Sequence, residues 1–151
     1  MREILFRGKP MPQYEDLPFV KDGWVYGYYI KTIGGNWHYV KDGVDETTLS
    51  DAIFVNYENS EGLLINGWVF VDPETVGQYT GITDINEKKI FEKDIVKVEL
   101  VDGEYFTTGY IREDEASFVV FGKDKGKAMS VSDEYEVIGN LCDNPELSKE
   151  V

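Results

Sequence analysis

The sequence has little of several things that mark common protein classes. A single cysteine, Cys142, stands in 151 residues, so no internal disulfide can form and an oxidising compartment would not stabilise the fold. No apolar run approaches the roughly 20 residues of a membrane-spanning helix, and the opening MREILFRGKP is too polar for a signal peptide. These absences predict a soluble, cytoplasmic protein.

Basic residues are also scarce, with 15 Lys and Arg against 29 Asp and Glu and a formal net charge of −14. This balance argues against nucleic-acid phosphate or an anionic membrane as the direct partner, and favours a protein or a basic partner. The chain is nevertheless 42% hydrophobic and 14% aromatic, unlike a disordered acidic chain. We expect it to fold as one domain or as two half-sized ones.

Helical periodicity is scarce, and strand patterns of period 2 dominate the first half. Segment 24–31 alternates two sets of side chains, and we expect the set with more aromatic bulk to face the core. That set is Trp24, Tyr26, Tyr28 and Ile30. The Gly-Gly-Asn at 34–36 then predicts a tight turn into a return strand at 37–40.

More strand material lies at 52–57 and 63–71, interrupted at 59–62 and at Asn66-Gly67. Asn-Gly is the strongest short hairpin signal in the chain. Pro73 predicts one helical turn capped by Asp72, because Gly77 follows too soon for a longer helix. We place the boundary between the two halves here.

The second half predicts an SH3-like barrel that begins near Phe91. Its five strands are expected at 95–101, 104–112, 117–121, 128–131 and 136–141, with one 3₁₀ turn at 132–135 and the last strand pairing with the first. The fold class is therefore all-β, an irregular N-terminal sheet packed on a C-terminal five-strand barrel. We divide the chain into a β-rich region at 1–76, a barrel with its leading loop at 77–143, and a frayed tail at 144–151.

Candidates for chemistry are few. His38 is the only histidine of the sequence and Cys142 the only cysteine. They lie far apart in sequence, and no third side chain that would orient a catalytic Cys-His pair is indicated. Asp84 opens a segment like a calcium loop, but Lys89 and Ile95 stand where that loop needs glycine and a carboxylate. We expect a polar turn instead, with Asp84 and the nearby Asn86 capping backbone N–H groups. The sequence thus predicts no catalytic residue, no metal and no cofactor.

Strand aromatics are the better candidates for partner binding. If the charged Arg112 faces outward, Phe106 and Tyr110 in the same register face solvent or a partner. The alternative is that both pack under the N-terminal half. Tyr29 is a third candidate, because the first half has more strand aromatics than one face of a small sheet can bury. Packing within the chain and a two-fold homodimer are the two ways to cover them.

Several stretches resemble one family, in the same order along the chain. They are 1–9 (MREILFRGK), 23–28 (GWVYGY), 71–81 (VDPETVGQYTG) running on through Asp84 to Val96, and 137–140 (VIGN) followed by 144–147 (NPEL). The chain resembles the YopX family. The resemblance implies a phage or prophage protein in a bacterial host, with an SH3-like C-terminal barrel, no established activity and no catalytic residues to transfer. Glu87 and Lys93 depart from the family's pattern, which often has glycine in place of Glu87 and usually has it in place of Lys93.

The leading functional hypothesis is a non-enzymatic accessory protein that presents a surface to a host or phage protein. The alternative is an acidic decoy that mimics nucleic acid and blocks a basic DNA-binding protein, based on the net charge of −14 and on acidic clusters at 113–115 and 133–136. Salt separates the two, because screening acts on exposed charge.

Overall fold

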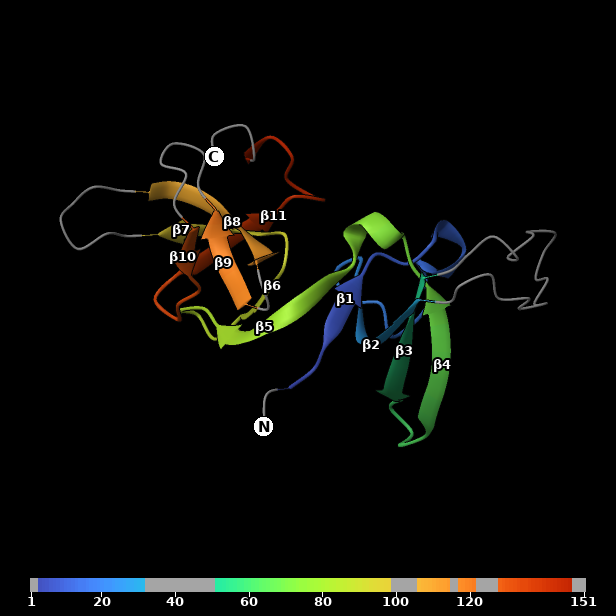
Figure 1. Cartoon of the computed structure of the whole chain (residues 1–151). Helices are drawn as coiled ribbons and strands as arrows, with labels where there is room; N and C mark the ends of the chain where they lie inside the picture. Colours follow the sequence, from blue (N-terminus) through green and yellow to red (C-terminus); the bar gives the residue numbers. More distant parts are fainter. Residues whose placement is uncertain (1–2, 32–50, 99–105, 115–116, 122–127, 148–151) are drawn as a thin grey trace. The chain divides into compact units, whose positions relative to one another are not determined.

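The computed structural model of the chain describes residues 3–31, 51–98, 106–114, 117–121 and 128–147 (Figure 1). These residues form strands and two short 3₁₀ turns, which confirms the all-β prediction. The strands are β1 (Phe6–Gly8), β2 (Val25–Lys31), β3 (Asp51–Glu58), β4 (Leu64–Phe70), β5 (Gly77–Thr83), β6 (Lys89–Phe91), β7 (Asp94–Val98), β8 (Phe106–Asp114), β9 (Ser117–Phe121), β10 (Ala128–Ser130) and β11 (Glu136–Asn140), and the turns are η1 (Pro12–Tyr14) and η3 (Pro73–Thr75). Within these ranges no helix has the length and hydropathy to cross a membrane.

The chain divides into two compact units, an N-terminal unit of Leu5–Val76 and a C-terminal unit of Met1–Ile4 with Gly77–Val151. In the N-terminal unit, antiparallel strands run in the order β4-β3-β2-β1. One face of this sheet carries β-branched side chains that are nearly or fully buried. They are Val25, Ile53, Val55, Val69 and Val71. β-Branched residues fit a pleated, buried surface, so this face is the core of the unit.

The core face of β2 is the opposite of the one predicted. Val25 is fully buried, whereas Tyr28 is 60% exposed; only Trp24, at the start of the expected set, is buried as well. Pairing with β3 decides the face, because Tyr29 lies opposite the fully buried Ile53. Gly27 lies on this core side with Val25. A Cβ at this position would lie 1.9 Å from the carbonyl oxygen of Phe54, so the β3 backbone approaches β2 where a side chain is lacking.

The Asn66-Gly67 hairpin prediction is also wrong. Both residues lie inside β4, paired with β3. The chain turns earlier, where the Asn59 side-chain oxygen accepts hydrogen bonds from the N–H groups of Glu61 at 3.0 Å and Leu63 at 2.9 Å. Gly62 completes the turn at φ +77°, a conformation that favours glycine. The expected return strand at 37–40 lies outside the described residues.

The single helical turn at Pro73 is confirmed. It is η3, and the Asp72 carboxylate accepts a hydrogen bond from the Glu74 N–H at 3.0 Å. Proline presets φ for a first helical position, and an aspartate before it satisfies an N–H that the short turn leaves free. The turn ends at the junction of the two units.

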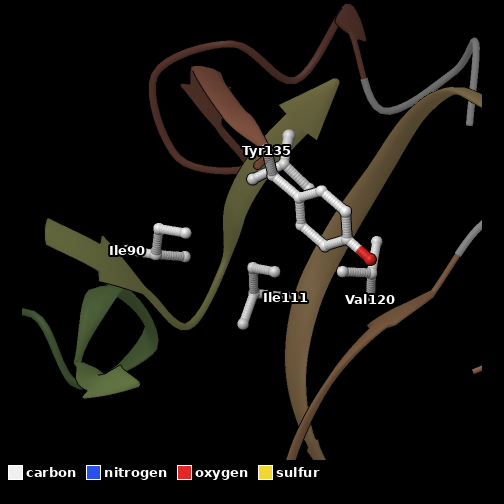
Figure 2. Close-up of a cluster of buried hydrophobic side chains, with 5 residues drawn as sticks. Ile90, Ile111, Val120 and Tyr135 are labelled. Carbon is white, nitrogen blue, oxygen red and sulfur yellow. The ribbon is translucent and has the colours of Figure 1, made fainter. Parts of the chain in front are cut away.

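The C-terminal unit contains the β5–β6 hairpin and a five-stranded antiparallel sheet of order β10-β9-β8-β7-β11. The last strand returns to the first, with Val137 opposite Val96, as an SH3-like fold requires. A small core joins these strands to β6 (Figure 2). It consists of Ile90, Val96, Ile111, Val120 and Tyr135.

Tyr135 both fills this core and holds a turn. Figure 2 shows its ring beside Ile111 and Val120, and its hydroxyl donates to the Ser130 carbonyl at 3.0 Å. Its backbone N–H donates to the carbonyl of Ser132 at 3.4 Å, which closes the turn expected at 132–135. Burial, followed by the nearby Glu134 charge, raises the pKa of Tyr135, so the phenol stays protonated and keeps its donor.

A polar turn at 84–88 replaces the calcium loop, as expected for Asp84. This carboxylate is 4% exposed and accepts hydrogen bonds from Asn86 N at 2.8 Å, Lys88 N at 2.9 Å and Val137 N at 3.0 Å. Burial alone would raise the pKa of Asp84, but these three N–H groups and the Lys88 charge lower it below its ordinary value. Asp84 therefore ties the β5–β6 turn to β11.

Candidate interaction surface

The side of β2, β3 and β4 that faces away from the core carries an aromatic row. Tyr28 lies opposite Phe54, and Phe54 lies opposite Trp68, so the three side chains are cross-strand neighbours on one face. The rings of Phe54 and Trp68 have centroids 4.8 Å apart and are tilted by 54°. We call Tyr28, Phe54 and Trp68 the aromatic row.

The two ends of the aromatic row are open to solvent. Tyr28 is 60% and Trp68 49% exposed, while Phe54 between them is half-buried. Ile30 and Leu64, on the same face by strand alternation, are 38% and 66% exposed. Clustered apolar side chains of this size on one face are typical of interaction sites.

Tyr29, predicted to bind a partner, lies on the other side of β2. Its hydroxyl donates to the buried carboxylate of Asp51, and its ring centroid is 5.4 Å from that of Phe6. Burial first, then the hydrogen bond and the charge of Asp51, raise the pKa of Tyr29 to about 12. Tyr29 is thus held within the sheet, and its neighbour Tyr28 is the aromatic that reaches solvent.

The other two predicted residues lie on β8, in the C-terminal unit. Arg112 is exposed and Ile111 fully buried, as the alternation predicted. Tyr110 is half-buried, and its ring centroid is 5.6 Å from that of Phe121. The β7–β8 register shifts between residues 96 and 98, so the alternation does not continue unbroken from Tyr110 to Phe106. The Phe106 side chain lies outside the part of the chain that the structure describes.

Of the two single residues considered for catalysis, the structure describes only Cys142. His38 lies outside the described residues. Cys142 is half-buried after β11, and its backbone N–H donates to Asn140 Oδ1 at 3.0 Å. Among the residues that the structure describes, no group of three or more His, Cys, Asp or Glu side chains could hold a metal ion.

One signal could have located the exposed aromatic row from the sequence. The core residues of β3 and β4 are β-branched and all have odd numbers, from Ile53 and Val55 to Val69 and Val71. The opposite side of both strands is therefore the outer one. Aromatic bulk on β2 suggested the reverse, because tyrosine and tryptophan are as common on interaction surfaces as in cores.

The fold defines an all-β protein in which a small antiparallel sheet precedes an SH3-like five-stranded sheet. The YopX protein family matches residues 24–149, and the chain belongs to this family, as the sequence resemblance predicted. Curated proteins show no match to the chain. Among solved structures, the crystal structure of protein EF1440 from Enterococcus faecalis is similar, with 19% identity over 97% of this chain and 99% of that chain and a TM-score of 0.46.

Proposed function

We propose that this YopX-family chain is a non-enzymatic accessory protein of the phage type, acting in the cytoplasm of a bacterial host by binding another protein. The observation that carries the proposal is the aromatic row, with Tyr28 60% and Trp68 49% exposed on one sheet face. Aromatic side chains with an exposed apolar surface are the usual anchors of protein interfaces.

The sheet behind the aromatic row supports this role. The pairing of β3 with β4 runs without a shift from Ala52 opposite Phe70 to Glu58 opposite Leu64. Ile53 and Val69 are 0% and 2% exposed beneath it. Anchors on a rigid, well-packed element lose little conformational entropy on binding, which favours affinity.

The test removes the anchors without touching the core. The double variant Tyr28→Ser with Trp68→Ser should lose a host or phage protein that the native chain captures from extract. The control is Ile85→Ser with Ile138→Ser, which removes residues that are 65% and 38% exposed in the C-terminal unit. Equal capture by the two double variants would contradict the proposal, and so would enzymatic turnover that one point mutation abolishes.

The decoy remains the second candidate, and the exposed carboxylates of Asp133, Glu134 and Glu136 support it. A decoy holds its target through exposed charge, so capture should fall steeply as salt rises. Capture through the aromatic row should persist in high salt, because burial of apolar surface is not screened. The same extract at low and high salt separates the two.

A further inference from the structure

Among the strands that the structure describes, β4 is an edge of its sheet, since the order in the N-terminal unit begins with it (Figure 1). The hydrogen bonds between β4 and β3 show which backbone groups of β4 point towards β3 and which point away from it. Val71 N donates to Asp51 O and Asn59 N donates to Leu63 O, both at 3.0 Å. Bonded pairs alternate along an antiparallel ladder, so odd-numbered residues of β4 bond to β3 and even-numbered residues face outward.

The outward groups form an open row of donors and acceptors. The N–H and C=O groups of Leu64, Asn66 and Trp68 point to the free edge, and in the described part of the chain no strand pairs with them there. At the far end, Met11 N donates to the Phe70 carbonyl at 2.9 Å, which fits this alternation. The open run is therefore 64–69.

This edge lacks the features that protect edge strands from pairing. Natural edges carry a lysine, a proline or a bulge, whereas β4 reads LINGWVF and pairs with β3 without a register shift. An exposed, uncharged and regular edge of this length readily accepts another strand.

The ends of β4 indicate the chemistry of that strand. Glu58 lies opposite Leu64, and Glu61 lies in the turn that precedes β4. Asp72 and Glu74 follow its other end. All four carboxylates are on exposed residues, so an uncharged edge lies between two negative ends.

A second copy fits this edge poorly. Paired antiparallel, it would place Glu58 and Glu61 of one copy near Asp72 and Glu74 of the other, at both ends of the joint, and like charges there oppose pairing. A strand with basic ends complements the edge instead.

We infer that β4 takes up an extended segment of a protein partner, about six residues long and uncharged, with Lys or Arg at both ends. This rests on the proposed function and names the partner's chemistry. Alternate side chains of the segment would lie beside Leu64 and Trp68 on the outer face. The others would lie beside Gly67, where an added Cβ would find no atom within 4 Å, so that side accepts a bulky residue.

The probe is the synthetic peptide KKVTVTVTKK, with EEVTVTVTEE as its matched control, added to the full chain labelled with ¹⁵N at low salt. We expect the lysine peptide to change the NMR chemical shifts of β4 and its neighbours alone. Hydrogen exchange should become slower at the N–H groups of Leu64, Asn66 and Trp68. The control peptide should bind at least about tenfold more weakly. Unchanged exchange at these three N–H groups at millimolar peptide would overturn the inference.

Two variants locate the contact. Asn66→Pro removes an outward N–H but none of the bonds to β3, and should weaken the lysine peptide at least about tenfold, whereas Asn66→Thr should bind it normally. Glu58→Lys with Glu61→Lys makes one end of β4 positive and leaves the other negative, so it should abolish the preference between the two peptides. The matched control Asp133→Lys with Glu134→Lys changes net charge equally in the C-terminal unit; an equal effect there would contradict the inference.

The inference and the proposed function can fail separately. If Tyr28→Ser with Trp68→Ser abolishes protein capture but Asn66→Pro does not, the sheet face binds and the β4 edge does not. If neither variant affects capture, the inference and the proposed function are both wrong. A stable dimer at low salt that Asn66→Pro converts to a monomer would assign the edge to a second copy and overturn the basic segment.

Discussion

Three non-glycine residues of the described chain, Asp22, Glu87 and Lys93, adopt a backbone conformation that suits glycine, and two of them lie in the C-terminal unit. Glu87 has φ 63° and Lys93 φ 69°, and these are the positions where resemblance to the YopX family implies glycine. Lys93 keeps its conformation through two bonds, from its N–H to the Ile111 carbonyl at 2.8 Å and from Leu141 N to its own carbonyl at 2.9 Å. The departures from the family pattern therefore leave the turns intact and place strain in them.

We expect Glu87→Gly and Lys93→Gly each to raise the free energy of unfolding by about 0.5–1 kcal/mol, because left-handed strain costs more than glycine's extra chain entropy. Urea unfolding monitored by fluorescence measures this. Lys97→Gly, at an exposed β7 position, is the control and should destabilise by about 0.5–1 kcal/mol. A loss of stability in all three variants would contradict the explanation.

The Tyr29–Asp51 pair makes stability depend on alkaline pH. The pKa of Tyr29 in the folded chain is raised to about 12 from 10.0. The contribution of Tyr29 to the free energy of unfolding is therefore fully present below pH 10 and is lost as pH rises towards 12. The loss is at most about 2–3 kcal/mol. Urea midpoints at intervals from pH 8 to 12 should show it, and Tyr29→Phe should lack this part of the decline. An identical decline in the variant would remove Tyr29 as the cause.

At the scale of elements, Asp84 joins the β5–β6 turn to β11 through three N–H donors. Its folded pKa is lowered, so it stabilises the fold above the unfolded value of about 4 and loses that contribution as pH falls further. Asp84→Asn should cost about 1–3 kcal/mol at pH 7, since one amide oxygen cannot replace both carboxylate oxygens.

Urea unfolding at pH 7 and pH 3 measures the Asp84 effect. The difference between the native chain and Asp84→Asn should shrink at pH 3, because this pH lies below the ordinary carboxyl pKa of 3.8 and the unfolded chain already binds the proton there. Asp133→Asn, on an exposed residue, serves as the control and should change stability by less than about 0.5 kcal/mol. An Asp84→Asn chain as stable as this control would show that the turn does not depend on the carboxylate.

Two glycines in the N-terminal sheet should respond in opposite ways to a methyl group. At Gly27 a Cβ would lie 1.9 Å from the Phe54 carbonyl, whereas at Gly67 it would find no atom within 4 Å. Gly27→Ala should therefore destabilise by about 3 kcal/mol or more, and Gly67→Ala should be neutral or stabilise by up to about 1 kcal/mol. Thermal unfolding compares them directly; similar losses in both would show that the β2–β3 approach is not close.

The elements that the sequence predicted well are those whose signal lies in neighbouring residues. The SH3-like strands and the Asp72-capped turn depend on residues that lie next to one another, so their pattern is visible without the fold. The Asn66-Gly67 prediction failed because Asn59 and Gly62 form the actual turn. The sequence contains the turn signals of both pairs and does not by itself decide between them. The exposed face was missed because β2 is apolar on both sides, and only pairing with β3 decides between them.

At the scale of the whole molecule, we expect net charge to limit self-association. With a charge of −14, two copies repel each other at low salt, and the carboxylates at both ends of β4 add a local repulsion. At about 1 M salt the Debye length falls to roughly 3 Å, so we expect the uncharged edge to pair with a second copy there. This pairing differs from the homodimer predicted from the sequence, which would cover the strand aromatics, and it is expected only when charge is screened.

We expect light scattering across a dilution series to give the monomer mass at low salt, and a mass that rises with protein concentration at about 1 M salt. Asn66→Pro should prevent this rise, because the pyrrolidine ring blocks the free edge where β4 would pair. Tyr28→Ser, which leaves the β4 edge unchanged, is the control and should associate like the native chain. A rise in mass that Asn66→Pro does not reduce would place self-association on a surface other than β4.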